Sequence, residues 1–189
     1  TKACERLAST PLRNLITIGG NIAKPLRWSD LPVALLALDA RIKIVGKKIR
    51  TVEADDFFAQ PAKHISYSDI IAEIILYEPG KNIIAGFSKF SATDFDYALI
   101  DAAVLIKTSG TRCAEAKAAV SALTPKPVRL KSAEKYIAGK ELNKNTLEGF
   151  AEAAISEIKI IDDYRASVEY RKNVLKTILK KLAQGKEQA

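Results

Sequence analysis

The residues of this 189-residue chain best suited to binding chemistry lie near its start, in the segment Thr17-Ile18-Gly19-Gly20-Asn21. Two adjacent glycines carry no Cβ, so backbone N–H groups there can come close to a bulky anionic ligand. Asn21 is a residue type that tolerates the left-handed conformation that such a turn often needs next. The segment predicts a tight turn, which is either an anion-binding turn or an ordinary surface turn.

A buried helix is predicted soon after this turn. Ser29 or Asp30 can accept hydrogen bonds from the free N–H groups of the first helical turn. Pro32 lies where its missing N–H matters least. The helix body, Val33–Leu38, is apolar on nearly every side, so we expect most of its surface to be covered.

Side chains of other reactive types are few. Cys4 and Cys113 are the two cysteines, neither lies in a C-x-x-C pair, and His64 is the single histidine. This composition argues against a zinc or iron–sulfur site built by this chain alone. His64 stands in a polar stretch and is interpreted as a surface residue.

The composition limits the classes of partner. The formal net charge of +8 could suit nucleic acid, an anionic surface or an acidic protein, but only 7% of the residues are aromatic and the lysines are scattered. We therefore expect no nucleic-acid partner. The longest apolar run, Leu31–Leu38, is too short to span a bilayer and no signal peptide is visible, which favours a cytoplasmic protein with no membrane partner.

The first part of the chain is predicted to contain a small antiparallel sheet. The segment Ala40–Val45 alternates apolar and basic residues, and a Gly46-Lys47-Lys48 turn leads into a paired strand over Ile49–Val52. A short helical turn over Asp55–Gln60 directs two phenylalanines into the core, and the β-branched run Ile70–Tyr77 predicts a buried strand. A break at Glu78-Pro79-Gly80-Lys81 predicts a domain boundary there.

The second part is predicted to be a meander followed by helices. Three strands are expected over Ile83–Phe90, Tyr97–Lys107 and Arg112–Leu123, with a turn at Ser109-Gly110. Helices should follow over Arg129–Ile137, from Asn143 or Asn145 to about Glu157, and from Arg165 or Ser167 onward. The fold class is thus α+β in two domains, residues 1–80 and 81–189.

Five blocks of the sequence, in order along nearly the whole chain, carry a family resemblance. The blocks are TIGGNIA with SDLPVALLALDA, DDFF, DIIAEIIL, FSKFSATDFD with LTPKPVRLKSAEKYIAGK, and DDYRASVEYRKNVLKTILKKL. Together they resemble the FAD-binding (medium) subunit of the molybdenum hydroxylases, the family of xanthine dehydrogenase and aerobic carbon monoxide dehydrogenase. The resemblance implies the second lobe of a two-lobed FAD-binding domain, followed by a C-terminal domain with a three-stranded antiparallel sheet covered by helices.

The resemblance also implies which residues contact FAD. They are Thr17, Ile18, Gly19, Gly20 and Asn21 around the diphosphate and ribityl region, Asp30 as an acidic contact, Ile71 near the isoalloxazine, and Lys89 near the flavin. Each has a plainer interpretation: Asp30 as a helix cap, Ile71 as a core strand residue and Lys89 as an exposed strand lysine. The segment Lys24–Trp28 departs from the family pattern, and Trp28 either stacks on a ring or covers the helix.

The implied role is electron transfer within a complex. Electrons would pass from a molybdopterin subunit through two [2Fe–2S] clusters of an iron–sulfur subunit to FAD, and then to an external acceptor. The family's first FAD lobe has no counterpart here, and the chain starts at Thr1 and contains no methionine. We therefore expect a fragment or a split subunit, with a separate or cleaved first lobe as a possible partner, and an inactive isolated chain. The alternatives are a flavin-free scaffold subunit and, more weakly, a basic nucleic-acid-binding module.

Overall fold

The computed structural model describes residues 2–5, 7–78, 80–93 and 96–186. Its first part runs α1 Lys2–Glu5, α2 Thr10–Arg13, α3 Ile18–Ala23, α4 Asp30–Ala37, β1 Arg41–Val45, β2 Ile49–Glu53, α5 Ala54–Ala59, α6 Pro61–His64 and β3 Ile70–Ile75. Its second part runs β4 Ile83–Phe90, β5 Ile100–Ser109, β6 Arg112–Ser121, β7 Val128–Arg129, α7 Lys131–Ile137, α8 Lys144–Glu157 and α9 Val168–Ala183. No helix within these residues is long and apolar enough to cross a bilayer.

The first sheet has the strand order β2-β1-β3 and is antiparallel throughout. The predicted hairpin is confirmed, and β1 is the central strand, with Ile42 and Ile44 fully buried. The prediction that Ile70–Tyr77 forms a buried strand is wrong in its burial, because β3 lies at the edge of the sheet and Ile70 is 69% exposed. The β-branched run therefore correctly indicates a strand, but it does not indicate whether that strand is central or at the edge of the sheet.

The second sheet has the order β4-β5-β6-β7, again antiparallel. The predicted three-stranded meander is confirmed over β4, β5 and β6, with Gly110 in the left-handed region at the β5–β6 turn (φ 60°). The two-residue strand β7 adds a fourth, short edge. The central strand β5 begins at Ile100, three residues later than the sequence predicts.

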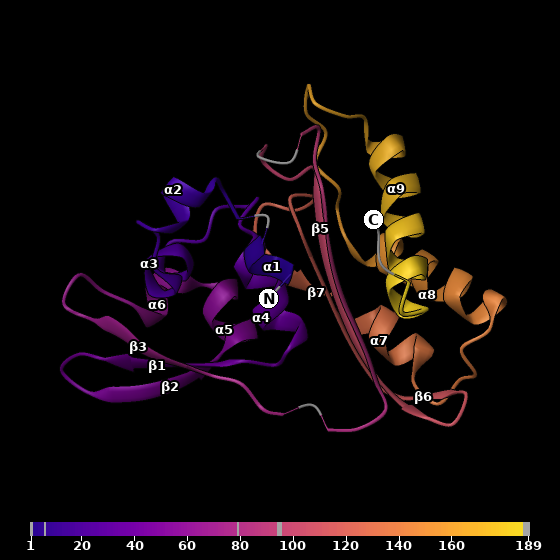
Figure 1. Ribbon diagram of the computed structural model, residues 1–189, viewed down its shortest axis with the longest axis horizontal. Helices are drawn as coiled ribbons and strands as arrows, with labels where there is room; N and C mark the ends of the chain where they lie inside the picture. Colours follow the sequence, from indigo (N-terminus) through magenta and orange to yellow (C-terminus); the bar gives the residue numbers. More distant parts are fainter. Residues whose placement is uncertain (1, 6, 79, 94–95, 187–189) are drawn as a thin grey trace.

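The second sheet separates two apolar cores. Helices α7, α8 and α9 cover one face, where residues such as Val104, Phe150 and Leu175 pack together. Helix α4 lies on the opposite face, where Ala103 and Ala119 of the sheet join the core of the first part. Figure 1 shows the long strands standing between the indigo-to-purple first part and the orange-to-yellow helices. The α+β class with a helix-covered antiparallel sheet is thus as predicted.

The helix starts in the second part follow their predicted caps. The side chain of Asn143 accepts a hydrogen bond from the Thr146 N–H at the start of α8, and the Ser167 side chain accepts one from the Tyr170 N–H at the start of α9. Each cap satisfies an N–H group that has no partner within its helix. Lys176 and Lys180 on α9 pair with Glu148 on α8, so this basic helix face is partly neutralised within the chain.

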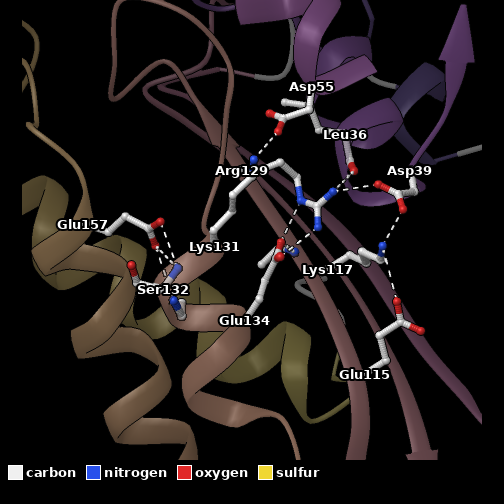
Figure 2. A network of polar contacts seen from close by, with 12 residues as sticks. Leu36, Asp39, Asp55, Glu115, Lys117, Arg129, Lys131, Ser132, Glu134 and Glu157 are labelled. Carbon is white, nitrogen blue, oxygen red and sulfur yellow. Dashed lines mark hydrogen bonds and ion pairs between the residues drawn. The ribbon is translucent and has the colours of Figure 1, made fainter. Parts of the chain in front are cut away.

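A polar network joins the two parts of the chain around Arg129 (Figure 2). The Arg129 guanidinium donates to both carboxylate oxygens of Glu134, at 2.7 and 2.8 Å, and to Asp39 Oδ1 at 2.8 Å. Lys117 also pairs with Asp39, and Lys131 reaches Asp55 at 2.5 Å. Because Asp39 and Asp55 belong to the first part and the cations to the second, these contacts hold α4 and α5 against the second sheet.

Candidate functional site

The segment Thr17–Asn21 is the start of a helix, not the tight turn that the sequence predicts. Thr17 is the N-cap of α3, and its Oγ1 accepts a hydrogen bond from the Gly20 N–H at 3.0 Å. Asn21 lies inside this helix, and the left-handed conformation expected for it is absent. The helix forms because the Thr17 side chain caps the Gly20 N–H, which would otherwise have no partner. The prediction of a turn considered only the two glycines and not this cap.

This helix start leaves two backbone donors for a ligand. The Gly20 N–H is taken by Thr17 Oγ1 and the Asn21 N–H by the Thr17 carbonyl. Among the described residues, no acceptor lies on the N–H of Ile18 or Gly19. Thr17 and Ile18 are exposed, so an anion can reach these donors from solvent, and the positive end of the helix dipole favours it.

The two glycines, Gly19 and Gly20, have different surroundings. A Cβ at Gly20 would lie 2.9 Å from Thr17 Oγ1, so a side chain there would disturb the cap. A Cβ at Gly19 would meet the Ile71 Cβ and carbonyl oxygen at 3.7 Å, an ordinary contact distance. Ile71 of β3 therefore lies next to the helix start, so two of the predicted site regions are neighbours.

The other two predicted site residues contact each other. Lys89 Nζ on β4 donates to Asp30 Oδ2 at 3.2 Å, and the side chains are only 6% and 4% exposed. This burial excludes the plainer interpretation of Lys89 as an exposed strand lysine. The Ser29 hydroxyl accepts from the Leu26 N–H, so Asp30 opens α4 without a side-chain cap from Ser29. Burial raises the pKa of Asp30, and the charge of Lys89 opposes that effect.

A third ionisable side chain, Asp101, neighbours the Asp30–Lys89 pair and was not predicted from the sequence. Asp101 on β5 is fully buried, makes a side-chain contact with Asp30 and accepts a hydrogen bond from Ser121 Oγ at 3.2 Å. Burial, together with the neighbouring charge of Asp30, raises the pKa of Asp101 well above its usual range. The available signal was a lone aspartate in the apolar run IDAAVLI, a position where an ionisable side chain needs a partner.

Trp28 lies between the two groups of site residues in the sequence and has a ring environment of its own. Its ring centroid is 5.0 Å from that of Tyr97, and the Arg27 guanidinium lies 5.5 Å from its centre. Within the described residues its ring therefore packs against the Tyr97 ring, and whether it also contacts a cofactor stays a prediction. Its Nε1 and the Oδ1 of Asn21 are buried atoms without a hydrogen-bond partner in the described part of the chain.

Two family models match the chain. Residues 1–77 match the FAD binding domain in molybdopterin dehydrogenase, and residues 85–185 match the CO dehydrogenase flavoprotein C-terminal domain. No cluster of metal-ligating side chains occurs within the described residues.

Curated proteins and solved structures agree with these matches. The chain is 28% identical to the nicotine 6-hydroxylase medium subunit of Paenarthrobacter nicotinovorans and 31% identical to the glyceraldehyde dehydrogenase medium chain of Sulfolobus acidocaldarius. Both alignments cover 95% of this chain, and 63% and 64% of the respective relatives, so the chain spans less than two thirds of their length.

The structural matches are close. A carbon monoxide dehydrogenase from Hydrogenophaga pseudoflava, which lacks the Mo-pyranopterin moiety of the molybdenum cofactor, superposes with a TM-score of 0.88 at 25% identity, over 95% of this chain and 63% of that one. Quinoline 2-oxidoreductase from Pseudomonas putida 86 gives 0.84 at 25% identity, over 97% and 66%. The chain therefore belongs to the FAD-binding (medium) subunits of the molybdenum hydroxylase family.

Proposed function

We propose that this chain is the FAD-carrying electron-transfer subunit, or a part of it, of a molybdenum-dependent hydroxylase complex. Its proposed partners are an iron–sulfur subunit with [2Fe–2S] clusters and a molybdopterin subunit, both of which the family resemblance implies. The relatives named as medium subunits, and a title that mentions the molybdenum cofactor, support an assembly of several subunits. The single observation that carries the proposal is the exposed start of α3, which lies in the part that matches the FAD-binding domain. Two N–H groups there have no acceptor among the residues that the structure describes. Bound FAD supplies a centre that accepts electrons singly and releases them in pairs.

The residues present fit a dinucleotide at this site. The Ile18 and Gly19 N–H groups can donate to diphosphate oxygens, and Gly19 places no side chain in their way. The orphaned Asn21 Oδ1 can accept from a hydroxyl or amide donor. On this proposal Ile71 lies beside the flavin. The buried ammonium group of Lys89, which is paired with Asp30, stabilises negative charge on the flavin.

The two segments that the family models match support further parts of the proposal. We assign residues 1–80 to the second FAD lobe and residues 81–189 to the C-terminal domain. Because donors from only one side reach the diphosphate, the isolated chain should hold FAD weakly and be inactive alone. We place the complex in the cytoplasm.

The competing function is a scaffold that assembles the complex without flavin. FAD binding to the purified chain, followed by flavin fluorescence quenching with and without a separately expressed first lobe, separates the two. Gly19→Ala should weaken FAD binding about tenfold, because it adds a methyl group next to the two proposed donors. The urea midpoint should stay the same or rise, because the new Cβ would contact Ile71 at an ordinary distance and alanine favours a helix more than glycine does.

Asp56→Asn, an exposed change on α5, is the matched control and should bind FAD like the parent. If flavin binds neither the chain nor its complex with the first lobe, the scaffold is the correct function. If Gly19→Ala binds as tightly as the parent chain, the helix start is not the FAD contact.

A further inference from the structure

Four polar side chains meet where α4 packs against the second sheet. Asp30 opens α4, and Lys89, Asp101 and Ser121 lie side by side on β4, β5 and β6, since Lys89 pairs with Asp101 and Asp101 with Ser121 in the strand register. The Asp30 and Asp101 side chains are almost completely buried, and so is that of Lys89. Water therefore cannot complete their hydrogen bonds from bulk solvent.

The donors in this cluster do not match its acceptors. Lys89 Nζ donates to Asp30 Oδ2, and Ser121 Oγ donates to Asp101 Oδ2, each at 3.2 Å. The Oδ1 atoms of both aspartates are buried and lack a donor among the residues that the structure describes. The two carboxyl groups are nevertheless close enough for each to affect the pKa of the other. Two ionised carboxylates cannot bond to each other, because neither carries a hydrogen.

We propose that Asp30 and Asp101 share one proton, and that Asp101 is thereby a positioning residue that holds Asp30 against Lys89. One proton satisfies both Oδ1 atoms, since a protonated carboxyl group donates to its ionised neighbour. It also changes the cluster from two negative charges and one positive charge to a balanced ion pair. The charged groups that act on Asp101 within the described chain are Asp30 from α4 and Lys89 from β4, and Ser121 from β6 is a neutral donor.

The burial of the pair supports this assignment. Burial raises the pKa of Asp101 well above that of a solvated aspartate, and the charge of Asp30 adds to the effect. Two carboxyl groups that share one site hold their last proton to higher pH, as in other carboxyl pairs. The consequence for FAD rests on the proposed function: a balanced cluster leaves Lys89 without excess negative charge beside the flavin.

The variant Asp101→Asn tests the shared proton, because the amide N–H can donate to Asp30 Oδ1 permanently while the amide oxygen still accepts from Ser121. Urea unfolding of the full chain is measured from roughly pH 5 to pH 8. The folded parent holds a proton that the unfolded chain releases above about pH 4, so its stability falls as pH rises towards the folded-state pKa. Relative to Asp101→Asn, the folding equilibrium constant of the parent should drop about tenfold per pH unit in that range.

Asp56→Asn is the control and should follow the parent at every pH, because Asp56 is an exposed aspartate. Parallel pH profiles of the parent and Asp101→Asn would overturn the proposal. A second measurement protects against a variant that does not fold: infrared spectra of the unmodified chain at neutral pH, with isotope-labelled aspartate, should show the carbonyl band of a protonated carboxylic acid. Absence of that band from the folded parent would also overturn it.

Neither measurement contains FAD, so the shared proton and the proposed function can fail separately. If the band is present and FAD does not bind, the pair is a structural feature of the interface between α4 and the second sheet. If FAD binds, its dissociation constant should rise above the pH at which the band disappears, while binding to Asp101→Asn should not change there.

Discussion

Asp163 shows at the scale of single residues how charge is balanced in this fold. Its carboxylate accepts hydrogen bonds from Arg27, Arg165 and Arg171, at 2.9, 3.1 and 2.6 Å. Arg171 lies on α9 and is fully buried. A buried guanidinium is stable only with a paired carboxylate and satisfied donors, and Arg171 obtains further acceptors from the Leu99 and Ala166 carbonyls.

Asp163 should make the chain sensitive to acid. Burial alone would raise its pKa, but the hydrogen bonds from Arg165 and the charges of Arg171 and Arg165 outweigh it, so the pKa lies well below the usual value. A lowered pKa contributes stability above about pH 4, the ordinary aspartate value, and this contribution is lost as pH falls through the folded-state pKa. Asp163→Asn should lower the free energy of unfolding by about 3 kcal/mol at pH 7, measured by urea titration.

The loss should shrink below about pH 4, where the unfolded parent chain also binds a proton. The adjacent Asp162 is exposed, so Asp162→Asn is a matched control expected within about 0.5 kcal/mol of the parent. An Asp163→Asn deficit that stays constant down to pH 2 would show that its charge is not what stabilises the site.

At the scale of elements, the sequence predicts features that depend on neighbouring residues, such as helix starts. It does not predict features that depend on contacts between distant segments, such as strand order. The sequence predicts the starts of α8 and α9 because Asn143 and Ser167 are residue types that favour helix N-caps. The position of β3 at a sheet edge could not be predicted, since strand order depends on pairing between distant segments. The sequence predicts a turn at the start of α3 because Gly-Gly disfavours helix, whereas in the structure the Thr17 cap offsets this preference.

The candidate site divides in the same way. The family resemblance led to the Thr17–Asn21 segment, Ile71, Asp30 and Lys89, and the structure brings Gly19 next to Ile71 and Asp30 next to Lys89. Their contact with FAD stays a prediction. Asp101 was missed because its partners come from three other elements, so its role depends on a register that no local pattern contains.

Helix α9 is expected to owe its stability to its buried face. Leu175 is fully buried between this helix and the second sheet, so Leu175→Ala removes apolar contact and leaves a cavity. We expect a loss of about 3 kcal/mol in the free energy of unfolding, measured with urea by far-UV circular dichroism. Asn173→Ala, on the exposed side of the same helix, should change it by no more than about 0.5 kcal/mol. Equal effects of the two substitutions would contradict the packing of α9.

At the scale of the whole molecule, the second sheet serves two cores at once. Its residues Val104 and Ile106 belong to the core under α7–α9, while Ala103 and Ala119 belong to the core around α4. Small residues at these last two positions let α4 lie close to the strands. Both cores are built on the same strands. If the sheet unfolds, the apolar residues of both cores become exposed to water, which favours unfolding of the whole molecule in one step.

Arg129 should be the residue on which this coupling depends most. Its side chain is 8% exposed and binds Glu134 and Asp39 together, with the Leu36 carbonyl at 3.4 Å (Figure 2). Arg129→Ala leaves a nearly buried Glu134 without its cation, so we expect a loss of about 3 kcal/mol. Lys131→Ala removes an ion pair to Asp55 from a side chain that is 63% exposed and should cost less than about 1 kcal/mol.

Two probes can follow both parts of the molecule in the same titration. Trp28, the single tryptophan, reports by fluorescence on the segment before α4, and far-UV circular dichroism reports on all elements. In the parent and in Lys131→Ala the two urea transitions should coincide, and in Arg129→Ala they should move together to lower urea. A Trp28 transition that precedes the circular dichroism change in the parent would mean that the first part unfolds by itself. The shared sheet would then not couple the two cores, whatever the energy of the Arg129 contacts.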